Sequence, residues 1–85
     1  MSEPTPETIA YSRPRKRSLT LRGHRTSVSL EDPFWEAFRE IARRRGQSVN
    51  ALASEIDAAR GTRSGLAAAI RLFVLAAMTS ERRSR

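Results

Sequence analysis

The chain has 85 residues, enough for one small domain only. It contains no cysteine, which excludes disulfide bonds and thiolate metal sites and makes oligomerisation the expected source of additional buried surface. Sixteen Lys and Arg residues against nine Asp and Glu residues give a formal net charge of +7, which favours a polyanionic partner.

The sequence predicts neither secretion nor membrane insertion. Residues 1–10 have no basic start and no apolar run, so we expect no signal peptide. The longest apolar run, residues 66–78, is interrupted by Arg71 and is shorter than the roughly 20 residues of a membrane helix. We therefore expect no membrane partner and a cytoplasmic, nucleoid-associated protein.

The N-terminal residues 1–18 are predicted to form a disordered arm, because they hold three of the four prolines and show no apolar periodicity. Basic residues in and just after this arm are suited to lie along a phosphate backbone or to reach into a minor groove. These residues are Arg13, Arg15, Lys16, Arg17 and Arg22. A solvated tail that only aids solubility is the alternative interpretation.

A short strand is predicted at about residues 24–30, where apolar and polar residues alternate. Thr26, Val28 and Leu30 share one face, and Arg25, Ser27 and Ser29 share the other. Residues 19–22 also alternate, but Gly23 interrupts the pattern as a bulge or a hinge. Because no other strand is predicted, the strand must pair with a second copy of the chain, which makes the protein an obligate dimer.

Three helices are predicted after the strand. Asp32 is the expected N-cap of the first helix, about 33–45, with Pro33 at its first position, and Gly46 ends it. Ser48 caps the second helix, about 49–60, which ends at Gly61. A third helix is expected at about 64–79, inside a domain of residues 19–79, and residues 80–85 form a basic tail.

Apolar positions of the strand and the first two helices fall on single stripes and are predicted to form the core of the dimer. They are Val28, Leu30, Phe34, Phe38, Ile41, Leu52 and Ile56. The third helix is apolar nearly all round. Since so small a chain cannot cover such a helix, we expect it to be buried across the dimer interface.

Enzymatic function is not predicted. His24 is the only histidine, and no glycine-rich phosphate loop follows a strand. The carboxylates lie mainly on helix surfaces beside arginines, which is typical of surface ion pairs rather than paired acid and base groups. We therefore expect no catalytic residue, no cofactor and no metal.

Residues 25–56 resemble the ribbon-helix-helix (Arc and methionine repressor-like) family of bacterial DNA-binding proteins. The closest match is Gly46-Gln-Ser-Val-Asn50, since a Gly-x-Ser-x-Asn turn between the two helices is typical of the family. The whole chain further resembles a subgroup with a basic arm and an extra C-terminal helix, as in Lys16-Arg-Ser-Leu-Thr-Leu21 and Ala69-Ile-Arg-Leu-Phe-Val74.

The resemblance implies an all-α fold with a short N-terminal strand, in which strands from two chains form an antiparallel ribbon that enters the major groove of double-stranded DNA. The implied base-contacting residues are Arg25, Ser27 and Ser29. The implied phosphate contacts come from the start of the second helix and are Gln47, Ser48, Val49 and Asn50. Ser48 also has the alternative role of an ordinary helix cap.

The function implied is that of a homodimeric, sequence-specific transcriptional regulator, a repressor that occludes its operator. Two of the three outward strand positions are serine, whose hydroxyl discriminates weakly between bases, so specificity should depend on Arg25. The third helix has no place in the minimal fold. It enlarges the dimer, pairs dimers along DNA, or binds another protein, as in the alternative function of an antitoxin or adaptor with a toxin or other protein partner.

Overall fold

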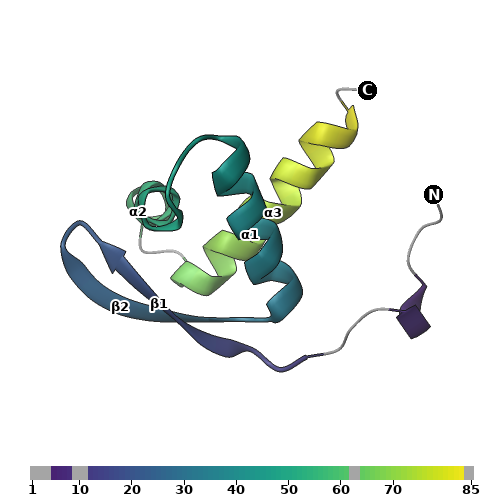
Figure 1. Ribbon diagram of the computed structural model, residues 1–85, viewed down its shortest axis with the longest axis horizontal. Helices are drawn as coiled ribbons and strands as arrows, with labels where there is room; N and C mark the ends of the chain where they lie inside the picture. The colour runs from purple at the N-terminus through teal and green to yellow at the C-terminus, as the bar shows by residue number, and fades with distance from the viewer. Residues whose placement is uncertain (1–4, 9–11, 62–63, 84–85) are drawn as a thin grey trace.

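The computed structural model describes residues 5–8, 12–61 and 64–83, without the side chains of residues 81–83. In chain order the elements are η1 (Pro6–Thr8), β1 (Arg15–Leu21), β2 (His24–Leu30), α1 (Asp32–Arg44), α2 (Val49–Arg60) and α3 (Leu66–Arg83). Figure 1 shows the two strands as a ribbon along one side of the three helices, with α2 above the hairpin end and α1 crossing α3. This arrangement confirms the predicted ribbon-helix-helix fold with an additional C-terminal helix.

The two strands of the ribbon belong to the same chain. β1 and β2 pair antiparallel, from Leu21 opposite His24 beside the turn to Arg15 opposite Leu30 at the open end. The turn residues Arg22 and Gly23 have φ angles of 50° and 84°, and positive φ at both positions is the geometry of a type I′ hairpin. The prediction that the strand at 24–30 lacks a partner in its own chain is therefore wrong.

Residues 15–18, which we predicted within the disordered arm, form the first half of β1. The reason is that the inward positions at this end are charged, so the strand shows no apolar alternation there. Arg15 and Arg17 lie on the same face as the buried Leu19, and both pair with Asp32 at the start of α1. An ion-paired carboxylate from another element thus replaces the apolar contacts expected of an inward strand position.

One chain closes its own core. The inner face of the ribbon contributes two residues from each strand, and each helix adds residues from its inward side. The buried residues are Leu19, Leu21, Val28, Leu30, Phe38, Ala42, Leu52, Ala53, Ile56, Ile70 and Val74. The predicted core residues Phe34 and Ile41 are partly buried against this cluster. The residues predicted for the dimer core are therefore packed together within one chain.

α3 is covered by its own chain on one side only. Ile70 and Val74 are buried against the rest of the chain, whereas Leu72 and Leu75 remain 63% and 61% exposed. The third helix is thus an integral part of the protomer core and still presents apolar residues to solvent. Among the described residues, no helix is long and apolar enough to cross a membrane.

The end of α1 and the start of α2 form a tight, well-bonded turn. After α1, the Gly46 N–H donates to the Arg43 carbonyl at 3.1 Å and the Gln47 N–H donates to the Ala42 carbonyl at 2.9 Å. This is a Schellman motif, and Gly46 supplies its left-handed residue with a φ of 69°. Ser48 then begins α2, because its hydroxyl accepts a hydrogen bond from the Ala51 N–H at 3.0 Å.

The N-cap of α1 is Glu31, not Asp32 as the sequence predicted. Glu31 has an extended backbone with ψ of 149°, and its side chain makes no capping bond. Asp32 is the first helical residue, and its carboxylate accepts a hydrogen bond from Arg17 of β1. The predicted capping side chain is therefore turned toward the ribbon, which attaches the hairpin to α1.

Candidate nucleic-acid interface

The outer face of the ribbon is exposed. Strand register puts three pairs of side chains on this face, because they alternate with the buried positions. The pairs are Lys16 with Ser29, Ser18 with Ser27, and Thr20 with Arg25. The predicted base-contacting residues Arg25, Ser27 and Ser29 thus lie on one surface, and β1 adds three residues to it. From the sequence, Lys16 was predicted within an arm and no role was predicted for Ser18 and Thr20, because the charged inward residues Arg15 and Arg17 conceal the alternation of β1.

The basic residues of the hairpin fall into two groups. Arg15 and Arg17 both contact Asp32, and Arg22 donates to Oδ2 of Asp57 at 2.7 Å. By contrast, the side chains of Lys16 and Arg25 make no ion pair or hydrogen bond within the part of the chain that the structure describes. Two cations on the outer face therefore remain available to a ligand.

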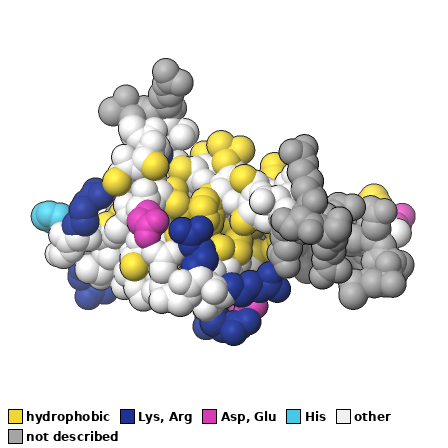
Figure 2. Space-filling model, turned by 90° about the horizontal axis from the view of Figure 1, so that it is seen from above, with side chains coloured by type: hydrophobic (Ala, Val, Ile, Leu, Met, Phe, Trp, Pro, Cys, Tyr) yellow, Lys and Arg dark blue, Asp and Glu magenta, His cyan; other side chains and the backbone are white. Residues whose placement is uncertain are grey.

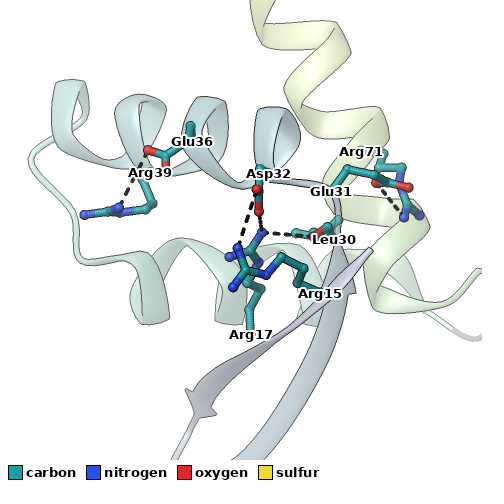
Figure 3. Close-up of polar contacts among 8 residues, drawn as sticks. All are labelled: Arg15, Arg17, Leu30, Glu31, Asp32, Glu36, Arg39 and Arg71. Atoms are coloured by element: carbon teal, nitrogen blue, oxygen red, sulfur yellow. Dashed lines mark hydrogen bonds and ion pairs between the residues drawn. The ribbon is translucent and has the colours of Figure 1, made fainter. Parts of the chain in front are cut away.

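Arg17 joins the ribbon to the first helix. Its side chain is only 14% exposed, donates to Asp32 and to the Leu30 carbonyl at 3.2 Å, and lies 5.4 Å from the ring centre of Trp35. Figure 3 shows Arg15 and Arg17 converging on Asp32 from β1. The hydrogen bond from Arg17 lowers the pKa of Asp32 below its usual value. Arg17 is thus held inside the fold.

A second ion pair attaches α3 to the same junction. Arg71 donates from Nε to Oε1 of Glu31 at 3.0 Å (Figure 3). Its guanidinium also lies 5.8 Å from the ring centre of Phe34. The pKa of Glu31 is lowered, first by a hydrogen bond from its own backbone and then by Arg71. The two pairs, Arg17 with Asp32 and Arg71 with Glu31, join β1 and α3 to the junction between β2 and α1.

The start of α2 lies beside the ribbon. Oδ1 of Asn50 accepts a hydrogen bond from the Thr20 backbone N–H at 3.0 Å, which joins the first turn of α2 to the edge of β1. Ser48 and Asn50 are exposed, whereas Val49 and Gln47 are half-buried. Gln47 accepts from Arg45 at 2.8 Å and donates to Glu55. Of the four predicted phosphate-contacting residues, Asn50 is therefore joined to the edge of β1.

Arg13 and His24 are not among the outward-facing pairs of the ribbon. Arg13 is exposed just before β1, and His24 is exposed at the turn end of β2. Within the described residues, no group of three or more His, Cys, Asp or Glu side chains is arranged to hold a metal ion. The chemistry that the described surface offers is a strip of hydroxyl groups between two cations, with a helix N-terminus at its edge.

The family model of the ribbon-helix-helix domain matches residues 14–78. The match begins just before β1, runs through both strands, α1 and α2, and includes most of α3. Searches of curated proteins and of solved structures found no match. Because the family model covers more than half of the 85 residues, the chain belongs to the ribbon-helix-helix family of non-enzymatic, DNA-binding regulators, whose members dimerise.

Proposed function

We propose that this protein is a sequence-specific transcriptional repressor that inserts the outer face of its ribbon into the major groove of DNA. The observation that supports the proposal is the Arg25 guanidinium, which has no ion pair or hydrogen bond among the described residues and lies on an exposed ribbon face whose other side chains are short or flexible. A two-stranded ribbon is narrow enough to enter the major groove. A dimer bound at a promoter in this way would prevent the transcription machinery from binding there. The protein would act in the cytoplasm of a bacterium.

Arg25 is the principal base-reading residue in this proposal. A guanidinium can donate two parallel hydrogen bonds to O6 and N7 of guanine, which no other base pair offers in the same pattern. Ser27 and Ser29 continue the face along β2, where a hydroxyl donates or accepts and so discriminates less. The short side chains let the backbone of the ribbon approach the floor of the groove.

Phosphate contacts set the register of the ribbon. The first turn of α2 has free backbone N–H groups and the positive end of the helix dipole, which together suit a phosphate. Asn50 fixes this turn to β1, so a phosphate bound at Ser48 and Val49 stays in a constant position relative to Arg25. Arg13 adds a contact before β1, whereas Arg15, Arg17 and Arg22 stabilise the fold through their carboxylate partners.

The proposed homodimer forms through the exposed side of α3. Leu72, Leu75 and Met78 are spaced three residues apart and form an apolar stripe, and two shallow grooves include Leu72. Figure 2 shows hydrophobic side chains gathered in the middle of the helical side of the molecule, with Lys and Arg along the border. A second copy would cover this stripe, which agrees with the dimers that the family forms.

DNA affinity measured against salt concentration tests the function. Wild type should lose affinity steeply as salt rises, because phosphate contacts release counterions. Arg25→Ala should lower the preference for a selected genomic fragment over a scrambled one by about tenfold. Arg39→Ala, which removes an exposed charge from α1, should keep the preference. A wild type with no preference among genomic fragments would rule out the repressor.

A further inference from the structure

The two strands of the ribbon are a sequence repeat. Residues 15–21 read Arg-Lys-Arg-Ser-Leu-Thr-Leu, and residues 24–30 read His-Arg-Thr-Ser-Val-Ser-Leu. On the outer face both strands have the order cation, serine, hydroxyl residue. On the inner face, Leu19 corresponds to Val28 and Leu21 to Leu30, and all four are buried. The similarity therefore extends to both faces.

The register of the hairpin converts this repeat into a local two-fold symmetry. Ser18 lies opposite Ser27, and an axis between them exchanges Lys16 with Arg25 and Thr20 with Ser29. The same axis exchanges the corresponding buried leucine and valine positions. A ribbon with this symmetry normally requires two identical strands from two chains. Here a single hairpin, closed by the Arg22-Gly23 turn, provides it.

We propose that one chain presents a complete DNA-reading ribbon, in which Lys16, Ser18 and Thr20 of β1 face the bases together with the three outward residues of β2. The ligand is a duplex DNA element with approximate inverted-repeat symmetry. The proposal rests on the groove insertion of the proposed function and goes beyond it, because it assigns β1 to base recognition. In a homodimer formed through α3, each protomer then brings its own ribbon to a separate element.

The positions of the two cations on the ribbon predict the spacing of the two guanines in the DNA element. Lys16 is opposite Ser29, and Arg25 is opposite Thr20, four residues further along β1. At about 3.4 Å per residue, this places the cations about 14 Å apart along the ribbon. That distance corresponds to about four base-pair steps, given about 3.4 Å per step in B-DNA. Because the two cations lie on different strands across the axis, they reach guanines on opposite DNA strands.

The symmetry is approximate, so we expect the two halves of the DNA element to be specified with unequal strength. Arg25 can bind a guanine through two fixed hydrogen bonds, whereas Lys16 is a flexible point charge. Both cations lack an intramolecular partner within the described residues, and both flank the small Ser18 and Ser27 hydroxyls at the centre. We therefore expect one strongly specified guanine opposite Arg25 and a weaker, symmetry-related one opposite Lys16.

The test is selection of preferred sequences from a randomised duplex library with the full chain. The variants are Lys16→Ala, Arg25→Ala and a double variant, Lys16→Arg with Thr20→Ser, which makes the outer faces of both strands identical. Arg13→Ala is the matched control, since it removes a cation three residues before Lys16 and outside the ribbon. Circular dichroism and thermal unfolding verify that each variant is folded.

Wild type should select two guanines on opposite strands, about four base-pair steps apart. Lys16→Ala should relax the preference at one of them by about fivefold or more, and Arg25→Ala at the other by about tenfold or more. The double variant should select a more nearly perfect palindrome. Arg13→Ala should weaken binding to all sequences alike and leave the selected element unchanged.

Two results would overturn the inference. If Lys16→Ala weakens binding uniformly, as Arg13→Ala does, and the double variant selects the wild-type element, then β1 does not read bases. Arg25→Ala would still change the element in that case, and the repressor function would stand. If wild type selects no element at all, the proposed function fails together with the inference.

Discussion

At the scale of single residues, the contacts of a charged side chain separate a structural role from one in binding. Arg15 and Arg17 alternate with Lys16 along β1 and carry the same single positive charge. They nevertheless point to the inner face and form ion pairs with Asp32. Lys16 and Arg25 point to the outer face and meet solvent. The role of each cation therefore follows from strand parity and from where the carboxylates lie.

Glu40 provides a test of how the carboxylates contribute to stability. Hydrogen bonds from Arg43 and then Arg44 lower the pKa of Glu40 from 4.5 to about 2. Because the pKa is lower in the folded state, ionised Glu40 stabilises the fold above pH 4.5, and this contribution is lost as the pH falls toward 2. The pKa values of Glu31, Asp32 and Asp57 are also lowered and act in the same direction.

We therefore expect the thermal midpoint of wild type to fall as the pH is lowered through this window, and the midpoint of Glu40→Gln to fall less. Circular dichroism melts at a series of pH values measure both. High salt should reduce the difference, since the groups are exposed and screened. Parallel pH dependence of the two proteins would show that the contacts of Glu40 with Arg43 and Arg44 are not formed in solution.

At the scale of elements, the hairpin depends on its two-residue turn. Arg22 and Gly23 both have positive φ, which matches the right-handed twist of the strands. Two interactions fix the hairpin to α2, namely Arg22 with Asp57 and the Thr20 N–H with Asn50. The turn therefore decides both the register of the outer face and its position relative to the helix.

Substituting the turn glycine tests this dependence. Gly23→Ala should lower the free energy of unfolding by about 1 to 2 kcal/mol, because an L-residue is strained at a φ of 84°. Among the described residues, no atom lies within 4 Å of the added methyl group, so the loss would come from the backbone alone. Gly65→Ala is the control, since Gly65 has equally open surroundings and no positive φ. Urea denaturation that shows equal stability for both variants would contradict the type I′ turn.

At the scale of the whole molecule, α3 has two sides with different roles. Ile70 is fully buried, so Ile70→Ala should lower the free energy of unfolding by about 2 to 5 kcal/mol at any protein concentration. Leu72 is mostly exposed, so Leu72→Ala should change the stability of the protomer by about 0.5 kcal/mol or less. Urea denaturation at low protein concentration measures both values.

Leu72→Glu separates the proposed dimer surface from the core. It should shift sedimentation equilibrium toward the monomer, because a buried carboxylate would face the apolar stripe of the second copy. Ala58→Glu, which adds the same charge to an exposed position of α2, should leave the dimer intact. A Leu72→Glu variant that remains as dimeric as wild type would exclude this interface. A monomeric wild type would leave the stripe for another protein, as in an adaptor or antitoxin.

The sequence by itself determined the features that depend on near neighbours. The period of two placed Val28 and Leu30 inward and Arg25 outward, and Gly46 with Ser48 marked the turn between the helices. These features follow from backbone geometry and from bonds between residues a few positions apart. For the same reason the resemblance to the ribbon-helix-helix family could be recognised from the turn and the spacing alone.

Only the tertiary structure decided which strand pairs with β2. The inward Arg15 and Arg17 conceal the alternation of β1 in the sequence, and their partner Asp32 becomes visible only when α1 is placed against the ribbon. The burial of Ile70 and Val74 likewise became visible only when α1 and α2 were placed against α3. Long-range ion pairs and packing are not encoded in local periodicity, so the pairing of β2 with β1 of the same chain could not be predicted.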